Sequence, residues 1–427
     1  MSSALVLGSE LIGALDRAPV RFGWVARVDV ASRFVRWQSV WAFAHRGYWL
    51  VTSLYLVIDA KLSPLQLVFI GTAQSIVGLV CEVPAGVVAD AISRRRSLVI
   101  AHLLMGVAMI ATGLVTSFAL LVATQMLWGL AWCFASGADV AWITDELNDR
   151  ERIDSVLARS ARSVAVGSAL GIVAFGLLAW GIGRGPAIVC SGALTFVLVA
   201  YPLTFPEANF RRTQHNTRRG SFTIAQGSID LARRDSEVRA VFVTSFLVAG
   251  GAETFVRLYA KRLVDLGFPT RSSSIAWYTV VSLLTLLVAA IGLRVVERRI
   301  GRVNVARRTY AVACATGAVA LLALAVTRNV TVAAFAAVIV GAMAANLTRT
   351  TGAIWLNQRT SNEIRATVHS FRAQCADLGE ITCSFALGVI AQRNLSAALL
   401  GAAALLGLAA MVSHTRRGGV TATGGPR

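Results

Sequence analysis

Charge is scarce in this sequence, and lysine is almost absent. Charged residues make up 15% of the 427 residues, and only 2 of the 41 basic residues are lysines. Soluble domains carry roughly 25% charged residues. The hydrophobic fraction is 56% and the mean hydropathy is +0.65. This composition excludes an ordinary soluble fold and predicts an all-α polytopic membrane protein.

Sequence signatures of catalysis and metal binding are also missing. The chain has no P-loop lysine motif, no HExxH and no GxSxG, so we expect that it is not an enzyme and that ATP does not drive it directly. Its six cysteines lie singly in apolar segments, and none forms a CxxC pair. We therefore expect reduced thiols, no metal and no cofactor.

Long apolar runs occupy most of the chain. Twelve are long enough to cross about 30 Å of hydrocarbon as helices. We expect an N-terminal six-helix bundle at 37–205 and a C-terminal one at 238–413, with a cytoplasmic lead-in (1–36), a cytoplasmic central loop (206–237) and a cytoplasmic tail (414–427). The expected spans are 37–58, 64–89, 97–116, 119–144, 160–182, 185–205, 238–262, 273–294, 307–327, 330–355, 366–391 and 394–413.

The basic residues are distributed unevenly between the two sides of this topology. With cytoplasmic termini, 31 Lys or Arg residues lie on the cytoplasmic side and 7 on the other, while Arg46, Arg257 and Arg349 lie within spans. The positive-inside rule therefore predicts that both termini are cytoplasmic. Because the net charge of +19 is spread over several short loops and tails, we expect contact with anionic lipid and no nucleic-acid binding.

A charged motif closes the second expected span, in the stretch CEVPAGVVADAISRRR (81–96). Glu82, Gly86 and Asp90 are four residues apart, so they share one face of a helix. Arginines at 94–96 follow at the exit. Glu82 is either a proton-binding or gating carboxylate, or a neutral acid that holds a neighbouring helix.

This motif resembles the loop between spans 2 and 3 of the major facilitator superfamily, which has the form G-x-x-x-D-x-x-G-R-K/R. Ser93 stands where the family has its second glycine. Three further stretches, 128–147, 250–263 and 353–381, resemble a bacterial drug-efflux-like branch. The resemblance extends over residues 37–413.

The resemblance implies a transporter with alternating access, in a bacterial cytoplasmic membrane, whose partners are a small-molecule substrate, protons and the lipid bilayer. It also implies a latch: Asp90 would meet the start of span 11 near 366–368 or Arg372, and Arg94, Arg95 and Arg96 would hold Asp145. We expect a monomer.

Two departures from the family pattern weaken the case for proton antiport. Gln125 precedes Gly129 where the family often has an arginine, and Gly167-x-x-x-Gly171 is not followed by proline. Transport is therefore better supported by the sequence than antiport.

Two charged or polar groups within expected spans need a cavity, a partner or a proton, because an ionised group at mid-bilayer costs about 2.5–3.5 kcal/mol. His45 and Arg46 either line a cavity, with Arg46 facing an acid or an anionic substrate, or Arg46 extends to the interface. Glu253 and Arg257 have the spacing of an ion pair, which either lines the cavity or only stabilises packing. Asn346 is a further cavity candidate.

Asp377 and Glu380 are three residues apart in the eleventh span. Two neighbouring acids in a low dielectric are costly to ionise together, so one is a candidate proton carrier. The alternative is that Arg257 or Arg46 satisfies both acids across the cavity.

We expect proton-coupled efflux of a small lipophilic or amphipathic solute, since the chain has 34 aromatic residues and few polar ones. The alternatives are metabolite uptake or facilitated diffusion by the same fold, and a non-transporting membrane sensor or enzyme.

Overall fold

A computed structural model describes residues 29–210, 235–268, 273–297, 305–360 and 365–414. Within these residues every regular element is a helix. The expected lead-in, central loop and tail therefore lie largely outside the described residues. The N-terminal half contains α2 (Val30–Ile58), α3 (Pro64–Ala91), α4 (Arg94–Leu114), α5 (Phe118–Ala135), α6 (Ala138–Leu147), α7 (Arg150–Ile182), α8 (Arg184–Val197) and α9 (Ala200–Leu203). The C-terminal half contains α11 (Ser236–Asp265), α12 (Ser273–Glu297), α13 (Val305–Val326), α14 (Val330–Val340), the π-helix η1 (Gly341–Leu347), α15 (Thr348–Asn357), α16 (Arg365–Gly379), the π-helix η2 (Glu380–Ser384), α17 (Phe385–Arg393) and α18 (Leu395–His414).

These elements follow the twelve expected spans, four of which are built from consecutive pieces; the sixth consists of α8 and α9. The fourth span divides into α5 and α6 at Gly137, whose φ of +76° ends the first piece. The tenth and eleventh spans contain η1 and η2. Two helices also start earlier than expected, α2 at Val30 and α7 at Arg150.

Ten helices are long and apolar enough to cross a membrane among the described residues. The expected first span (α2) and eleventh span (α16 to α17) are not among these ten. Both contain charged and polar residues that lower their hydropathy. Such residues are tolerated in a spanning helix only where they face protein or water, so these two helices are where a polar site is expected.

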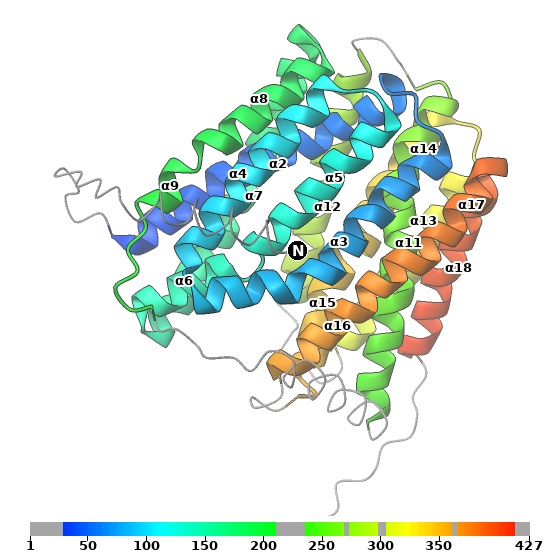
Figure 1. Cartoon of the computed structure of the whole chain (residues 1–427). Coiled ribbons are helices and arrows are strands. Elements are labelled where there is room, and N and C mark those ends of the chain that lie inside the picture. The colour runs from blue at the N-terminus through cyan, green and yellow to red at the C-terminus, as the bar shows by residue number, and fades with distance from the viewer. Residues whose placement is uncertain (1–28, 211–234, 269–272, 298–304, 361–364, 415–427) are drawn as a thin grey trace, which may run out of the picture.

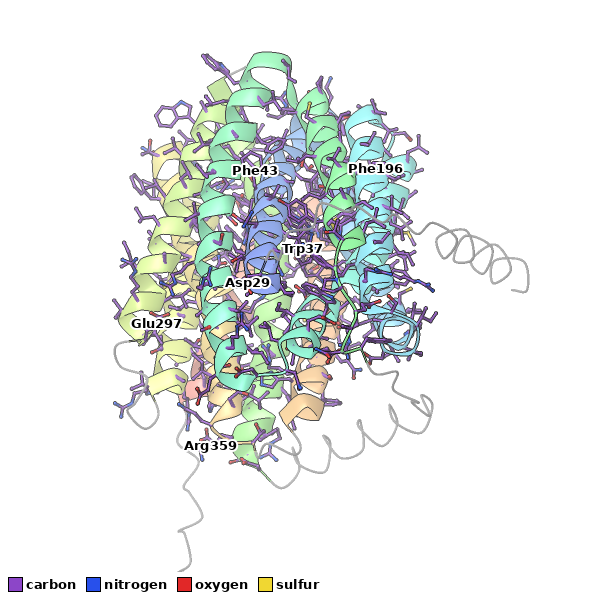
Figure 2. The ribbon with its side chains drawn as sticks, turned by 90° about the vertical axis from the view of Figure 1, so that its left-hand side faces the viewer. Asp29, Trp37, Phe43, Phe196, Glu297 and Arg359 are labelled. Atoms are coloured by element: carbon purple, nitrogen blue, oxygen red, sulfur yellow. The ribbon has the colours of Figure 1, made fainter. Side chains whose placement is uncertain are left out.

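The two halves use the same close contact between their first and fifth helices. In the N-terminal half α2 packs on α7, and a Cβ at Gly171 would collide with the carbonyl oxygen of Phe43. In the C-terminal half α11 packs on α16, and a Cβ at Gly379 would collide with the carbonyl oxygen of Phe246. Figure 2 labels Phe43 on α2. The matched contacts support two structurally related six-helix halves, and they give the Gly167-x-x-x-Gly171 pattern a packing role.

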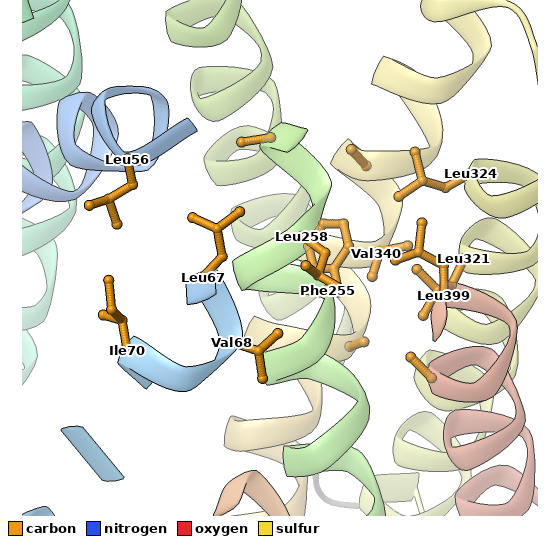
Figure 3. Packing of buried hydrophobic residues seen from close by; sticks show 14 of the residues in the cluster. Leu56, Leu67, Val68, Ile70, Phe255, Leu258, Leu321, Leu324, Val340 and Leu399 are labelled. Atoms are coloured by element: carbon orange, nitrogen blue, oxygen red, sulfur yellow. The ribbon is translucent and has the colours of Figure 1, made fainter. Parts of the chain in front are cut away.

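The halves meet along α3, which packs on α11, α16, η2 and α17, and along α12, which packs on α7 and α2. Figure 1 shows α3 and α12 between α4 and α8 on one side and α13 and α18 on the other. Val68 of α3 packs within 2.8 Å of the Cβ position of Gly388 on α17. Figure 3 shows Val68 beside α11, which carries the buried Phe255 and Leu258. This apolar contact joins the two halves at the end of the bundle where α3 begins.

Candidate functional site

Four carboxylates from four neighbouring helical elements form one group, which we call the carboxylate cluster: Glu82 of α3, Glu253 of α11, Asp377 of α16 and Glu380 of η2. The negative charge of Glu380 is repelled by Glu253 and Asp377, and that of Asp377 by Glu82. The sequence placed these acids in three different spans, and the fold brings them together where α3 packs on α11 and α16.

One guanidinium group lies within this cluster among the described residues. Arg257 Nε is 2.5 Å from Glu253 Oε1, which is the ion pair that the four-residue spacing predicts. Arg257 also donates to Gln74 Oε1 of α3 at 3.2 Å and lies 5.6 Å from the ring of Trp49. Ser75 Oγ of α3 donates to Glu380 Oε2 at 3.0 Å. Arg257 compensates one carboxylate, so the cluster has more acids than bases.

Both π-helices carry candidate residues. Glu380 is the first residue of η2, and Asn346 lies in η1, where its Nδ2 donates to the carbonyl oxygen of Gly341 at 2.7 Å. A π-helix widens the helical turn and is common at functional sites. The hydrogen bond of Asn346 stays within its own helix, so this residue supports the irregular turn.

His45 is surrounded by tryptophans of α2 and α5. Its ring centroid lies 5.7 Å from Trp41, 6.4 Å from Trp49, 5.4 Å from Trp128 and 5.9 Å from Trp132. Trp49 Nε1 donates to His45 Nε2 at 3.1 Å, and His45 Nδ1 is buried without a hydrogen-bond partner among the described residues. We call the four tryptophans the tryptophan wall.

Sequence reasoning missed this wall, although the four-residue spacing of 41, 45 and 49 in α2, and of 128 and 132 in α5, places each set on one helix face. This spacing along each helix could have been recognised in the sequence. It does not show that the tryptophan face of α2 packs against the tryptophan face of α5.

Three arginines form a second charged group, which we call the arginine trio: Arg46 of α2, Arg349 of α15 and Arg372 of α16. The charge of Arg349 repels those of both Arg46 and Arg372. Within the described part of the chain no carboxylate forms an ion pair with any of them, and Arg372 Nε is buried without a hydrogen-bond partner. The expected pairing of Arg46 with the acids of the eleventh span is not formed in this structure.

The motif loop is held by acids of its own half. Arg94 lies 3.4 Å from Asp90 and 2.9 Å from Asp145, so the structure brings these three expected residues together. Arg96 donates its backbone N–H to Ser93 Oγ at 3.0 Å, which makes Ser93 the N-cap of α4.

A residue that the sequence did not single out also holds this loop. Glu207 accepts from Ser93 Oγ at 2.6 Å and from the backbone N–H of Arg95 at 2.8 Å, and its carboxylate lies 3.9 Å from Arg95 Nε. The serine that replaces the family's glycine is therefore engaged in two hydrogen bonds.

Asp90 and Arg372, the two residues expected to meet in the latch, remain apart in this structure. The ion pair of Asp90 among the described residues is with Arg94, whereas Arg372 lies beside Gly352 of α15. A Cβ at Gly86 would meet no atom within 4 Å. The latch therefore stays a prediction for a conformation in which α3 and α16 approach at this end.

Comparisons with known proteins agree on one family. The sequence pattern of the Major Facilitator Superfamily matches residues 39–384. The comparison of the sequence with curated proteins returned no match.

Several solved structures share the fold at low identity. The nucleoside transporter NupG is 15% identical, with a TM-score of 0.71 over 91% of this chain and 100% of that one. A bacterial homologue of the human lysosomal transporter Spinster, in an inward-facing and unoccupied conformation, is 13% identical with a TM-score of 0.70 over 91% and 97%. The human organic anion transporter MFSD10 is 13% identical with a TM-score of 0.60 over 88% and 99%.

Proposed function

Because this chain belongs to the major facilitator superfamily, we propose that it is a proton-coupled exporter of small amphipathic molecules in a bacterial cytoplasmic membrane. The family makes it a transporter and not an enzyme. Proton coupling, export and a place in the drug-efflux-like branch are the parts that we propose.

The carboxylate cluster is the observation that carries proton coupling. Four acids accompany one arginine where α3 of the N-terminal half packs on α11, α16 and η2 of the C-terminal half. Each ionised group at this depth costs about 2.5–3.5 kcal/mol unless it is paired, and neighbouring acids raise that cost for one another. Binding a proton removes the charge, so Asp377 and Glu380 are suited to take up and release protons during transport.

Protonation at this place can change the balance between two conformations. Glu380 and Arg257 both reach across to α3, through Ser75 and Gln74. A change of charge on the C-terminal half therefore alters its contact with the N-terminal half directly. A proton that moves inward gains about 2.3 kcal/mol per 100 mV of membrane potential, which is free energy available to expel a solute.

The contacts between the halves are consistent with one end closed. At the end where α3 begins, Gln392 of α17 accepts from the backbone N–H of Leu65 at 3.3 Å, and Arg184 of α8 donates to Ser274 of α12 at 3.4 Å. At the opposite end the ion pairs between described residues, such as Arg94–Asp145 and Arg307–Glu237, each stay within one half. With cytoplasmic termini, the contacts between the halves at the end where α3 begins support an inward-facing state.

The second candidate function is uptake of a metabolite by the same mechanism. The same cluster would serve a symporter, because a carboxylate can take up a proton from either side. NupG, which shares the fold, is a nucleoside transporter. Direction is therefore decided by the transport assay.

The experiment uses inside-out membrane vesicles from cells that express the chain, energised to an acidic lumen and followed with a pH-sensitive dye. Cells that express the chain are first screened against a panel of compounds for a change in susceptibility. The compounds that show a change are then added to the vesicles one at a time. We expect a substrate to release protons from the lumen in the wild type and not in an Asp377→Asn, Glu380→Gln double variant. Glu297→Gln, at the exposed end of α12, is the matched acid-to-amide control and should behave as the wild type. Unchanged proton release in the double variant would refute proton coupling through the cluster.

A further inference from the structure

We infer that the transported solute is an aromatic organic anion, whose acidic group binds the arginine trio and whose ring packs on the tryptophan wall. This inference rests on the proposed transport function and names the substrate class of the same site. It depends on the arginine trio and the tryptophan wall, whereas the proposed proton coupling depends on the carboxylate cluster.

The trio spans both halves of the molecule. Arg46 belongs to α2 of the N-terminal half, and Arg349 and Arg372 belong to the C-terminal half. Arg46 and Arg349 are accessible to solvent, although both lie within expected spans, and the charge of Arg349 acts on that of Arg46. Because Arg46 and Arg349 come from different halves and are both accessible, we place the substrate between them.

Among the described residues, no carboxylate forms an ion pair that would neutralise the positive charge of the trio. The acids close to the site act on one another and on Arg257, and no ion pair joins any of them to Arg46, Arg349 or Arg372. Arg46 and Arg372 are instead opposed by Arg349. Like charges that act on one another within a membrane-spanning bundle are unfavourable without a counter-ion.

Arginine differs from the acids in how it can be neutralised. A carboxylate loses its charge by binding a proton, but a guanidinium group stays protonated under all physiological conditions. Only an anion can therefore compensate the trio, and guanidinium groups bind carboxylate, sulfonate or phosphate oxygens with paired hydrogen bonds. Arg372 Nε, buried and without a partner, is a donor that such an oxygen would satisfy.

The aromatic surface begins at the residue next to Arg46. His45 contacts all four tryptophans of the wall, and its Nδ1 is a further polar atom without a partner. Trp132 stacks on Trp41 with an interplanar angle of 29° and on Trp128 with one of 10°. It is nevertheless 40% exposed, on the side of α5 that faces α2. The ring of Trp132 lies 5.9 Å from that of His45, the chain neighbour of Arg46, and an indole face with a cationic group nearby along the helix fits a solute with a flat ring and one acidic group.

The test measures binding without transport, using purified full-length protein in detergent and isothermal titration calorimetry. The probe is 2-naphthalenesulfonate, which keeps its charge at all working pH values. Its neutral counterpart is 2-naphthalenesulfonamide, and its non-aromatic counterpart is cyclohexanesulfonate. We expect the naphthalenesulfonate to bind at least about 10-fold more tightly than either, because charge-assisted hydrogen bonds and ring stacking each contribute. Equal affinity for the sulfonate and the sulfonamide would overturn the inference.

Variants assign the binding to the trio. Arg349→Gln and Arg46→Gln should each weaken naphthalenesulfonate binding about 10-fold or more and leave sulfonamide binding unchanged, while Arg349→Lys should retain part of the affinity. Arg393→Gln, at the exposed end of α17, is the matched control. Thermal melting verifies that each variant is folded. Wild-type affinity in both glutamine variants would refute the role of the trio.

The outcome separates this inference from the proposed function. Sulfonate binding that depends on the trio, without any substrate-induced proton release in vesicles, would support the substrate class and contradict proton coupling. Proton release with neutral or cationic compounds, without sulfonate binding, would support the proposed function and overturn the substrate class.

Discussion

The carboxylate cluster and the arginine trio are two charged regions in one membrane-embedded bundle, and they differ in how their charge is balanced. In the cluster, four acids accompany one arginine, Arg257, which pairs with Glu253. Ser75 donates to Glu380 and Gln74 accepts from Arg257, and these hydrogen bonds tie the group to α3. In the trio, three arginines oppose one another and have no acid partner among the described residues.

The difference follows from the chemistry of the side chains. Excess acids can be neutralised by protons, which are always available, whereas excess arginines need an anion from outside the protein. The cluster is therefore suited to carry the coupling ion and the trio to carry the solute. The following predictions separate the two roles.

The largest effect is expected for Glu380→Gln. The amide can still accept from Ser75 but cannot take up a proton, so proton release on addition of a substrate should fall about 100-fold or more, as for a group essential to coupling. The affinity for naphthalenesulfonate should change by less than about 3-fold, because Glu380 does not act on the trio. Dye-monitored vesicles and calorimetry measure the two quantities on the same variant, and a large loss of affinity would contradict the separation.

Arg349→Gln should have the opposite effect: it should impair substrate binding and transport but leave proton coupling intact. Transport of radiolabelled naphthalenesulfonate in inside-out vesicles should fall about 10- to 100-fold, since a charge-assisted hydrogen bond contributes about 1.5–3 kcal/mol. The stimulation of the remaining transport by the pH gradient should persist. If the gradient no longer stimulates the variant, the trio takes part in coupling and the comparison fails.

Trp132→Leu tests the aromatic part of the site. Removing the exposed indole should weaken naphthalenesulfonate binding about 3- to 10-fold, while cyclohexanesulfonate binding stays within about 2-fold. Calorimetry with the two sulfonates gives the ratio. An equal loss for both compounds would mean that Trp132 supports the site without contacting a ring.

The smallest effect is expected at the motif loop. Asp145→Asn removes the partner of Arg94 at a half-exposed position, where ion pairs contribute about 1 kcal/mol or less. We expect transport rates to change by about 2- to 5-fold, with no change in the affinity for naphthalenesulfonate. A larger effect of Asp90→Asn than of Asp145→Asn would support the predicted contact of Asp90 with α16 in another conformation.

Much of the fold could be predicted from the sequence, because apolar length and the positions of polar breaks decide which segments span a membrane. The expected spans correspond to the observed helices, and the spacing of Glu253 and Arg257 predicted their ion pair. The helix break at Gly137 and the two π-helices could not be predicted, because hydropathy does not report local hydrogen bonding.

The site was predicted only in part, because its residues come together through packing between distant segments. The candidate list contained Arg46 and Arg372, but the charge balance of the trio depends on where Arg349 projects. Glu207 was assigned to the central loop, yet it holds Ser93 and Arg95. Such contacts depend on tertiary structure, and the spacing of residues along one helix carries no information about them.

The division between the two regions is tested most directly by one transport measurement on three proteins. Inside-out vesicles are loaded with unlabelled naphthalenesulfonate, and exchange with radiolabelled compound is followed with and without an acidic lumen. We expect the wild type to exchange the compound and to accumulate it when the lumen is acidic, and Glu380→Gln to exchange without accumulation. Arg349→Gln should exchange about 10- to 100-fold more slowly, with the remaining transport still stimulated by the acidic lumen. Accumulation by Glu380→Gln at the wild-type level, or full exchange by Arg349→Gln, would contradict the assignment of protons to the acids and of the solute to the arginines.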